Sequence, residues 1–148
     1  MKAVVWTKYG SPDVLQLKEI IKPTPKDDEV LIKVFATSIN DWECGILNGK
    51  PYLSRILSGF LKPRIKILGI DLAGQVEVVG RNVKQFKFGD KIFGDLSGSG
   101  FGGFAEFVCA HENALALKPA EMTFEHAAAI PHTALLALQG LHKGQIKN

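Results

Sequence analysis

The chain has 148 residues, of which 46% are hydrophobic and 22% charged, and its 18 basic and 15 acidic residues give a net charge of +3. This length fits one domain, at about 100–200 residues per domain, and the composition excludes a disordered segment. No apolar run is long enough to span a membrane, and the N-terminus lacks the apolar core of a signal peptide. We therefore expect a soluble protein with a packed core.

The positive charge is concentrated in residues 44–70, which contain five basic residues and no acidic residue. Such a segment is typical of an anion-binding or nucleic-acid-binding patch. Its charges are nevertheless spread out and are not interleaved with aromatic residues for base stacking. We interpret the segment as a solvated loop and expect neither nucleic acid nor a membrane as a partner.

The two cysteines, Cys44 and Cys109, are too far apart for a local metal site and too few for a disulfide framework. The simplest interpretation is a reducing, cytoplasmic location. The four histidines show no spacing typical of a metal-ligand set. We expect them on helix surfaces or partly buried.

The first half of the chain contains three segments that alternate apolar and polar residues or are rich in β-branched residues. The predicted strands are Lys2–Thr7, Leu15–Ile20 and Glu29–Ile39. The first two predict a hairpin around a turn at residues 10–12. Asn40 is a suitable N-cap for a short helix through Asn48, and apolar residues continue at helical spacing over 53–61.

The second half contains further short strands separated by glycine-containing turns. They are predicted at Leu72–Val79, Lys91–Phe93, Phe104–Ala110 and Ala114–Leu117. Short strands at this spacing favour a closed or partly open barrel. Thr123 is a suitable N-cap for a helix through Ala129, and Pro131 begins a second helix that ends near His142.

Two features invite functional hypotheses. Residues 98–103 match the pattern GxGxxG, but a strand follows them, whereas a dinucleotide site requires a helix N-terminus there. We interpret them as a glycine-rich loop between strands. Glu43 and Asp71 form an acid–base pair only if the fold brings their segments together, and two unrelated carboxylates are the default.

Four longer motifs occur in an informative order. They are ILGIDLAGQVEVVG (Ile67–Gly80), VGRNVKQFKFGDKIFG (Val79–Gly94), GGFAEFV (Gly102–Val108) and LKPAEMTFEHAAAIP (Leu117–Pro131). In this order they resemble the catalytic domain of the medium-chain dehydrogenase/reductase superfamily, and the zinc-independent quinone oxidoreductase type in particular. The resemblance runs over the whole chain. It implies a mainly β fold, a GroES-like partly open β-barrel over residues 1–122, and a helical connection over 123–148 towards a Rossmann domain absent from this chain.

The zinc ligands of the superfamily are missing. In zinc-dependent relatives a cysteine and a histidine stand where this chain has Asn40 and Ile70, and isoleucine has no donor atom. The cluster of four cysteines that binds structural zinc is also absent. The resemblance therefore implies no metal site in this chain.

The resemblance also implies the chemistry. We expect an oxidoreductase that uses NADPH or NADH to reduce a quinone, enone or carbonyl group of a small-molecule substrate. Asn40, Glu43 and Tyr52 are the expected catalytic residues, and Asn40 and Asp41 are expected at the cofactor. Leu136-Ala137 replaces a Thr-Ala pair that lies near the cofactor in many relatives. Without zinc, the substrate oxygen needs donors such as the Asn40 amide or the Tyr52 hydroxyl.

The cofactor pyrophosphate would bind mainly in the absent domain, so we expect the isolated chain to be inactive. The alternative is a non-catalytic GroES-like interaction module or a pseudoenzyme. The sequence leaves the oligomeric state open, a homo-oligomer included.

Overall fold

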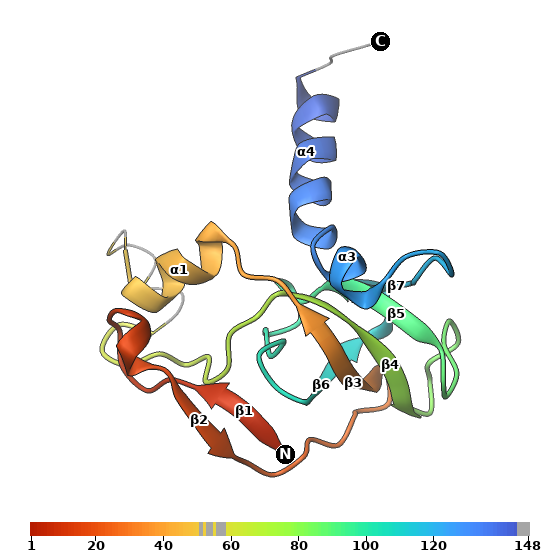
Figure 1. Cartoon of the computed structure of the whole chain (residues 1–148), viewed down its shortest axis with the longest axis horizontal. Coiled ribbons are helices and arrows are strands. Elements are labelled where there is room, and N and C mark those ends of the chain that lie inside the picture. The colour runs from red at the N-terminus through yellow and green to blue at the C-terminus, as the bar shows by residue number, and fades with distance from the viewer. Residues whose placement is uncertain (51, 53–54, 56–58, 145–148) are drawn as a thin grey trace.

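A computed structural model describes residues 1–50, 52, 55 and 59–144. Five strands form an antiparallel sheet in the order β6-β3-β4-β5-β7. They are β3 (Glu29–Thr37), β4 (Asp71–Val79), β5 (Lys91–Asp95), β6 (Phe107–His111) and β7 (Leu115–Leu117). Because β6 and β7 are separate edges, this sheet is open (Figure 1). The predicted mainly β, partly open fold is confirmed.

The predicted N-terminal hairpin is present. β1 (Lys2–Val5) pairs antiparallel with β2 (Gln16–Glu19). Isolated bridges from Ala3 to Ala105 and from Val5 to Ile67 connect β1 to the rest of the chain. The connection between β1 and β2 includes the expected turn residues 10–12 and continues into a short 3₁₀ helix, η1 (Pro12–Val14).

Both predicted N-caps are confirmed. Asn40 precedes α1 (Asp41–Asn48) with extended backbone angles, and α1 ends at Gly49, whose φ of 62° glycine tolerates without strain. Thr123 precedes α3 (Phe124–Ala128), and its Oγ1 accepts from the N–H of His126 at 3.2 Å. Of the helical spacing expected over 53–61, positions 53, 54 and 56–58 lie outside the described residues.

The main core lies against the five-stranded sheet and contains alternating residues of β3 and β4 such as Val30, Ile32, Leu72 and Val76. Leu31 is buried as well, so both faces of β3 are covered at its start. In the β4–β5 pairing, Asp71 lies opposite Asp95. This packed sheet therefore holds two carboxylates side by side at one end.

The glycine-rich stretch at 98–103 lies in the loop between β5 and β6, as expected. The N–H of Gly103 donates to the carbonyl oxygen of Gly69 at 2.9 Å. A second 3₁₀ helix, η2 (Glu112–Ala114), follows β6. No helix begins at this glycine-rich stretch, so it lacks the helix N-terminus that a dinucleotide site requires.

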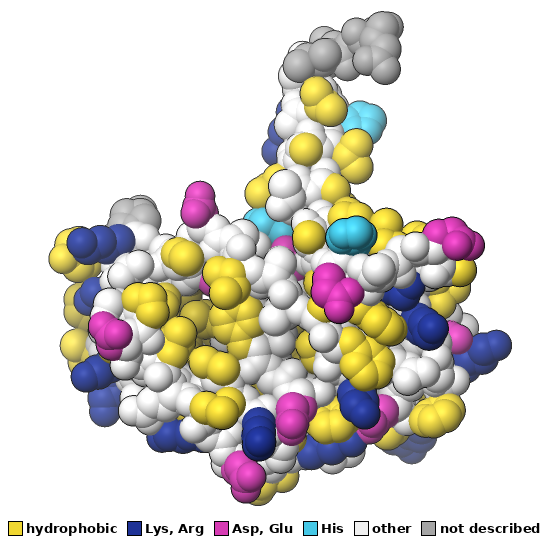
Figure 2. All heavy atoms as spheres, viewed as in Figure 1, with side chains coloured by type: hydrophobic (Ala, Val, Ile, Leu, Met, Phe, Trp, Pro, Cys, Tyr) yellow, Lys and Arg dark blue, Asp and Glu magenta, His cyan; other side chains and the backbone are white. Residues whose placement is uncertain are grey.

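The last two helices differ in how they pack. Ala127 and Ala128 of α3 are buried against Ala73 of β4. The following helix, α4 (Pro131–Lys143), projects away from the sheets (Figure 1), and hydrophobic side chains stand along it (Figure 2). Its leucines are about half exposed, at 47–54%: Leu135, Leu136, Leu138 and Leu141. In the described part of the chain, no helix has the length and apolar character needed to cross a bilayer.

Candidate active site

Asn40 is held by a capping box at the start of α1. Its Oδ1 accepts from the N–H of Trp42 at 3.2 Å, and Oε2 of Glu43 accepts from the N–H of Asn40 at 3.1 Å. Because Oδ1 is the acceptor in this cap, the amide nitrogen Nδ2 points to the other side. It donates to Oδ2 of Asp71 at 3.3 Å, and its second hydrogen remains available to a ligand.

Glu43 is a buried carboxylate, 2% exposed, that joins α1 to the segment before β4. Its Oε1 accepts from the N–H of Ile70 at 2.9 Å, while Oε2 serves the capping box. The fold therefore brings Glu43 beside the segment that carries Asp71, as the acid–base hypothesis required. Each carboxylate has its own donors, however, and no hydrogen bond joins the two.

Asp71 is fully buried at the first position of β4. Its Oδ2 accepts from Ser38 Oγ at 3.1 Å as well as from Asn40, and its Oδ1 accepts from the N–H of His132 at 2.8 Å. Burial raises the pKa of Asp71, against the lowering effect of its hydrogen bonds to His132 and Ser38. This one side chain connects the start of α1, the start of β4 and the start of α4.

His132 and Asp95 form a second polar pair beside Asp71. His132 Nδ1 lies 3.0 Å from Oδ2 of Asp95, and both side chains are mostly buried, at 13% and 12% exposed. The N–H of Ser97 donates to Oδ1 of Asp95 at 2.7 Å. Burial acts to raise the pKa of Asp95, but the hydrogen bonds from Ser97 and His132 outweigh it and lower this pKa. The ionised carboxylate then accepts a hydrogen bond from a protonated Nδ1 of His132.

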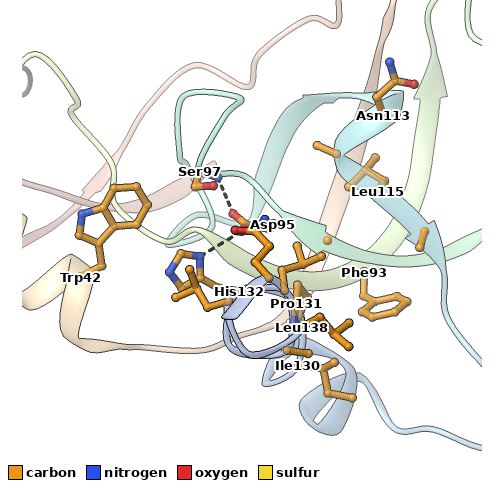
Figure 3. Close-up of a pocket in the computed structure, with 17 residues that line it drawn as sticks. Trp42, Phe93, Asp95, Ser97, Asn113, Leu115, Ile130, Pro131, His132 and Leu138 are labelled. Atoms are coloured by element: carbon orange, nitrogen blue, oxygen red, sulfur yellow. Dashed lines mark hydrogen bonds and ion pairs between the residues drawn. The ribbon is translucent and has the colours of Figure 1, made fainter. Parts of the chain in front are cut away.

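The indole of Trp42 stacks on the imidazole of His132, with ring centroids 5.4 Å apart and an interplanar angle of 18°. Figure 3 shows the His132 ring between Trp42 and Asp95. In the described residues, Nε2 of His132 has no hydrogen-bond partner. The ring is thus fixed on one edge and one face while its second nitrogen stays available.

Two hollows adjoin this stacked pair. One, of about 520 Å³, is lined by Asn40, Asp41, Trp42, His132, Thr133 and Leu136, and we call it the Asn40 hollow. The other, of about 610 Å³, lies between α4 and strands β5 and β7, with Phe93, Leu115 and Leu138 in its wall (Figure 3), and we call it the Phe93 hollow. Trp42, His132 and Leu136 line both, so the two hollows adjoin at these residues.

The structure brings together some of the predicted site residues. Asn40 and Asp41 line the Asn40 hollow, and Glu43 lies behind it in the core. Tyr52 is 69% exposed, its ring centroid is 4.9 Å from the Arg55 guanidinium, and it lines neither hollow.

Sequence reasoning missed Asp95 and His132. His132 is partly buried, as the histidines were expected to be, but its pairing with Asp95 was not foreseen. The pair is 37 residues apart and no motif spacing links the two. Only the register that sets Asp95 opposite Asp71, together with the contact between Asp71 and the start of α4, creates the pair.

Among the described residues, the side chains around Asn40 and Ile70 do not form a set of metal ligands. Ile70, at the position of a zinc-binding histidine in zinc-dependent relatives, is fully buried and apolar. Within residues 1–50 and 59–144, no three His, Cys, Asp or Glu side chains gather as a metal-binding group. The hollows instead combine apolar walls with a small number of oriented polar groups, which is typical of a site for an organic ligand.

The open antiparallel sheet, with polar side chains gathered where β4, β5, α1 and α4 meet, is the arrangement of a GroES-like β domain. The alcohol dehydrogenase GroES-like domain matches residues 26–120, and the chain belongs to this family. The predicted membership of the medium-chain dehydrogenase/reductase superfamily, of the quinone oxidoreductase type, is confirmed by the relatives and solved structures below.

A tomato (Solanum lycopersicum) protein, 2-methylene-furan-3-one reductase, is 37% identical over 150 residues, which cover 97% of this chain and 37% of the relative. The quinone oxidoreductase from Coxiella burnetii has a TM-score of 0.89 and 32% identity, covering all of this chain and 46% of that one. The Escherichia coli quinone oxidoreductase complexed with NADPH has a TM-score of 0.82 and 27% identity, covering 97% and 41%. The chain thus spans less than half the length of these proteins.

Proposed function

We propose that this chain is the catalytic-domain portion of a zinc-independent, NAD(P)H-dependent oxidoreductase that reduces a quinone, enone or carbonyl group. The observation that carries the proposal is the Asn40 amide. Its orientation is set by the cap bond from Trp42, and one of its two N–H groups remains for a ligand in the Asn40 hollow.

The residues of the hollow fit the reactive end of a nicotinamide cofactor and a small flat substrate. The polar groups are few and the wall includes the apolar side chain of Leu136, which is typical of a site for an organic ligand. When bound, the nicotinamide supplies a hydride, and the substrate oxygen then gains negative charge. A positioned amide such as that of Asn40 stabilises this charge.

Relatives support the classes of cofactor and substrate. The E. coli neighbour is complexed with NADPH, and the tomato relative is a reductase of 2-methylene-furan-3-one, whose name describes an enone. We carry both classes to this chain as part of the proposal. In this proposal, the parts of the relatives that this chain does not span determine the choice between NADPH and NADH.

The other expected residues take different roles in the proposal. Asp41 lines the Asn40 hollow and is proposed to contact the cofactor. Glu43 is proposed as a positioning residue, because main-chain N–H groups occupy both of its oxygens. Tyr52 lies outside both hollows, so its donor role has no geometric support and the proposal rests on Asn40.

We also propose a cytoplasmic location, to which the free state of Cys44 and Cys109 is suited. A homo-oligomer is compatible with the exposed leucines of α4. The same surface favours the alternative function, a non-catalytic interaction module. Neither function involves nucleic acid or a membrane as a partner in our proposal.

The test uses a longer protein that contains this chain, assayed with quinones, enones and aldehydes and with both reduced cofactors. Asn40→Ala should lower kcat/KM by about 10- to 1000-fold. Asn40→Ser keeps a capping acceptor but loses the amide donor, so it should lose activity while keeping most of the stability. Asn82→Ser, at an exposed loop position, is the matched control and should have no effect.

Two outcomes would contradict the proposal. Wild-type protein that binds cofactor without reducing any of these substrates would favour the interaction module. Stoichiometric zinc that survives dialysis against a mild chelator would contradict zinc independence.

A further inference from the structure

We propose that His132 is the proton donor of the reduction, delivering the Nε2 proton to the substrate oxygen on which charge develops. This inference rests on the proposed function and adds to it the source of the proton. It is carried by the geometry of three side chains, Asp95, His132 and Trp42, none of which the sequence motifs pointed to.

Asp95 determines how the imidazole is used. Its carboxylate lies 3.0 Å from Nδ1 of His132 and is itself fixed by the N–H of Ser97 at 2.7 Å. A carboxylate only accepts, so Nδ1 carries a proton and the ring exchanges protons through Nε2.

Trp42 and the backbone fix the position of the ring. The indole covers one face of the imidazole, and the N–H of His132 is bonded to the buried Asp71. Both rings line the Asn40 hollow. The Asn40 amide and the His132 ring therefore border the same space, one suited to stabilise a substrate oxygen and the other to protonate it.

The charged groups around His132 come from three elements. Asp95 at the end of β5 contacts the ring, Asp71 at the start of β4 contacts its main chain, and Asp41 of α1 lines the same hollow. Asp41 is the other titratable residue lining the hollow, and its negative charge at the N-terminus of α1 suits an acceptor. Glu43 is buried with both oxygens occupied, so His132 is the best-placed donor.

The substrate receives a hydride, two electrons and one hydrogen, at a carbon, and the π electrons of the reduced double bond move to the oxygen. The Nε2–H bond of the imidazolium breaks, and a new O–H bond forms with that proton. The neutral imidazole keeps Nδ1–H on Asp95, and water returns a proton to Nε2. The product is an enol from an enone and an alcohol from an isolated carbonyl group. From a quinone it is a keto tautomer of the hydroquinone, which becomes the hydroquinone when the carbon that received the hydride loses a proton and the second oxygen gains one.

Two substitutions of His132 separate proton donation from a structural role. The amide nitrogen of Asn occupies roughly the place of Nδ1, so His132→Asn keeps the bond to Asp95 but has no Nε2. His132→Gln instead places an amide near Nε2 that has no transferable proton. We expect both to lower kcat by about 100-fold or more, the lower range for general acid catalysis, with KM changed much less. His126→Gln, at an exposed histidine of α3, is the control and should behave as wild type.

A pH profile gives a readout that a structural role would not move. In the wild-type protein kcat should fall as rising pH removes the Nε2 proton, and this fall should vanish in both His132 variants. Wild-type activity in His132→Asn, or an unchanged profile, would overturn the inference while leaving the proposed function intact. Loss of all activity in the wild-type protein would instead contradict the proposed function.

A measurement on the chain itself is independent of activity. ¹⁵N spectra of histidine-labelled protein should show His132 protonated at Nδ1 in its neutral form, whereas Asp95→Asn should shift the proton towards Nε2. A neutral His132 protonated at Nε2 in the wild-type chain would overturn the assignment, whatever the activity of the longer protein.

Discussion

The main-chain N–H of His132 donates to Oδ1 of Asp71 at 2.8 Å and so ties the first turn of α4 to the first residue of β4, 61 positions away. The other oxygen of Asp71 accepts from the side chains of Ser38 and Asn40. One buried carboxylate thus holds together the three segments around the Asn40 hollow. Its protonation state should therefore affect stability and site geometry together.

Asp71→Asn tests this carboxylate. In the variant, the amide nitrogen of the asparagine is a donor that faces the donors of Ser38 and Asn40. We therefore expect the free energy of unfolding, measured in acid, to be lower by about 1–3 kcal/mol. Burial raises the pKa of Asp71 in the folded state above the ordinary value of 3.8. Between these two pKa values the folded protein binds more protons than the unfolded protein, so wild-type stability falls as pH rises through this range. The difference between the wild type and the variant should therefore shrink as pH rises.

Urea denaturation at a series of pH values measures this difference. Asp28→Asn, at an exposed loop position, is the matched control and should show no such trend. A difference that grows with pH would mean that the Asp71 carboxylate is stabilised in the fold, contrary to its burial.

Asp95→Asn should show the opposite pH dependence. Hydrogen bonds from Ser97 and His132 lower the pKa of Asp95 below 3.8 despite burial, so its stabilising contribution is present above 3.8 and is lost as pH falls through the folded-state value. We expect the variant to lose about 1.5–3 kcal/mol at neutral pH, the range for hydrogen bonds to a charged group. Melting temperatures of the variant and the wild type should converge in acid; a constant gap would contradict the assignment.

Glu43→Gln examines the carboxylate in the capping box. Glutamine has one acceptor oxygen for two main-chain N–H groups, those of Asn40 and Ile70, so one buried donor loses its partner. The expected loss is about 1–3 kcal/mol in the free energy of unfolding. Glu121→Gln, an exposed change of the same chemistry, should cost nothing measurable. Unchanged stability with lost activity in the longer protein would instead assign Glu43 a catalytic role.

The exposed leucines of α4 predict self-association of the isolated chain. Leu138 and Leu141 are 54% and 49% exposed on a helix whose only buried residue is Pro131. Leu138→Glu should shift the chain towards a monomer in sedimentation velocity. Gln139→Glu adds the same charge at the next position and should leave the association unchanged. A wild-type chain that stays monomeric at high concentration would remove this helix as an association surface.

Local sequence signals predicted most elements because their causes are local. Asn40 and Thr123 cap α1 and α3 with their own side chains, and the alternation of β4 follows from burial of one face. The turn expected at residues 10–12 lies in the connection between β1 and β2, but the 3₁₀ helix that begins at Pro12 was not predicted. The burial of Leu31 beside Val30 and Ile32 was also not predictable, because it depends on what covers the second face of β3.

The candidate site, too, depends partly on local sequence and partly on tertiary contacts. The amino-acid sequence by itself determined the family, the cap at Asn40 and the apolar residue at position 70 that excludes a histidine ligand there. Only the tertiary structure decided that Asp71, Asp95 and His132 meet. It also decided that both oxygens of Glu43 accept from main-chain N–H groups and that Tyr52 lies outside both hollows. The reason is that a carboxylate's partners depend on strand register and on where α4 begins, and contacts between residues 37 and 61 positions apart leave no local pattern.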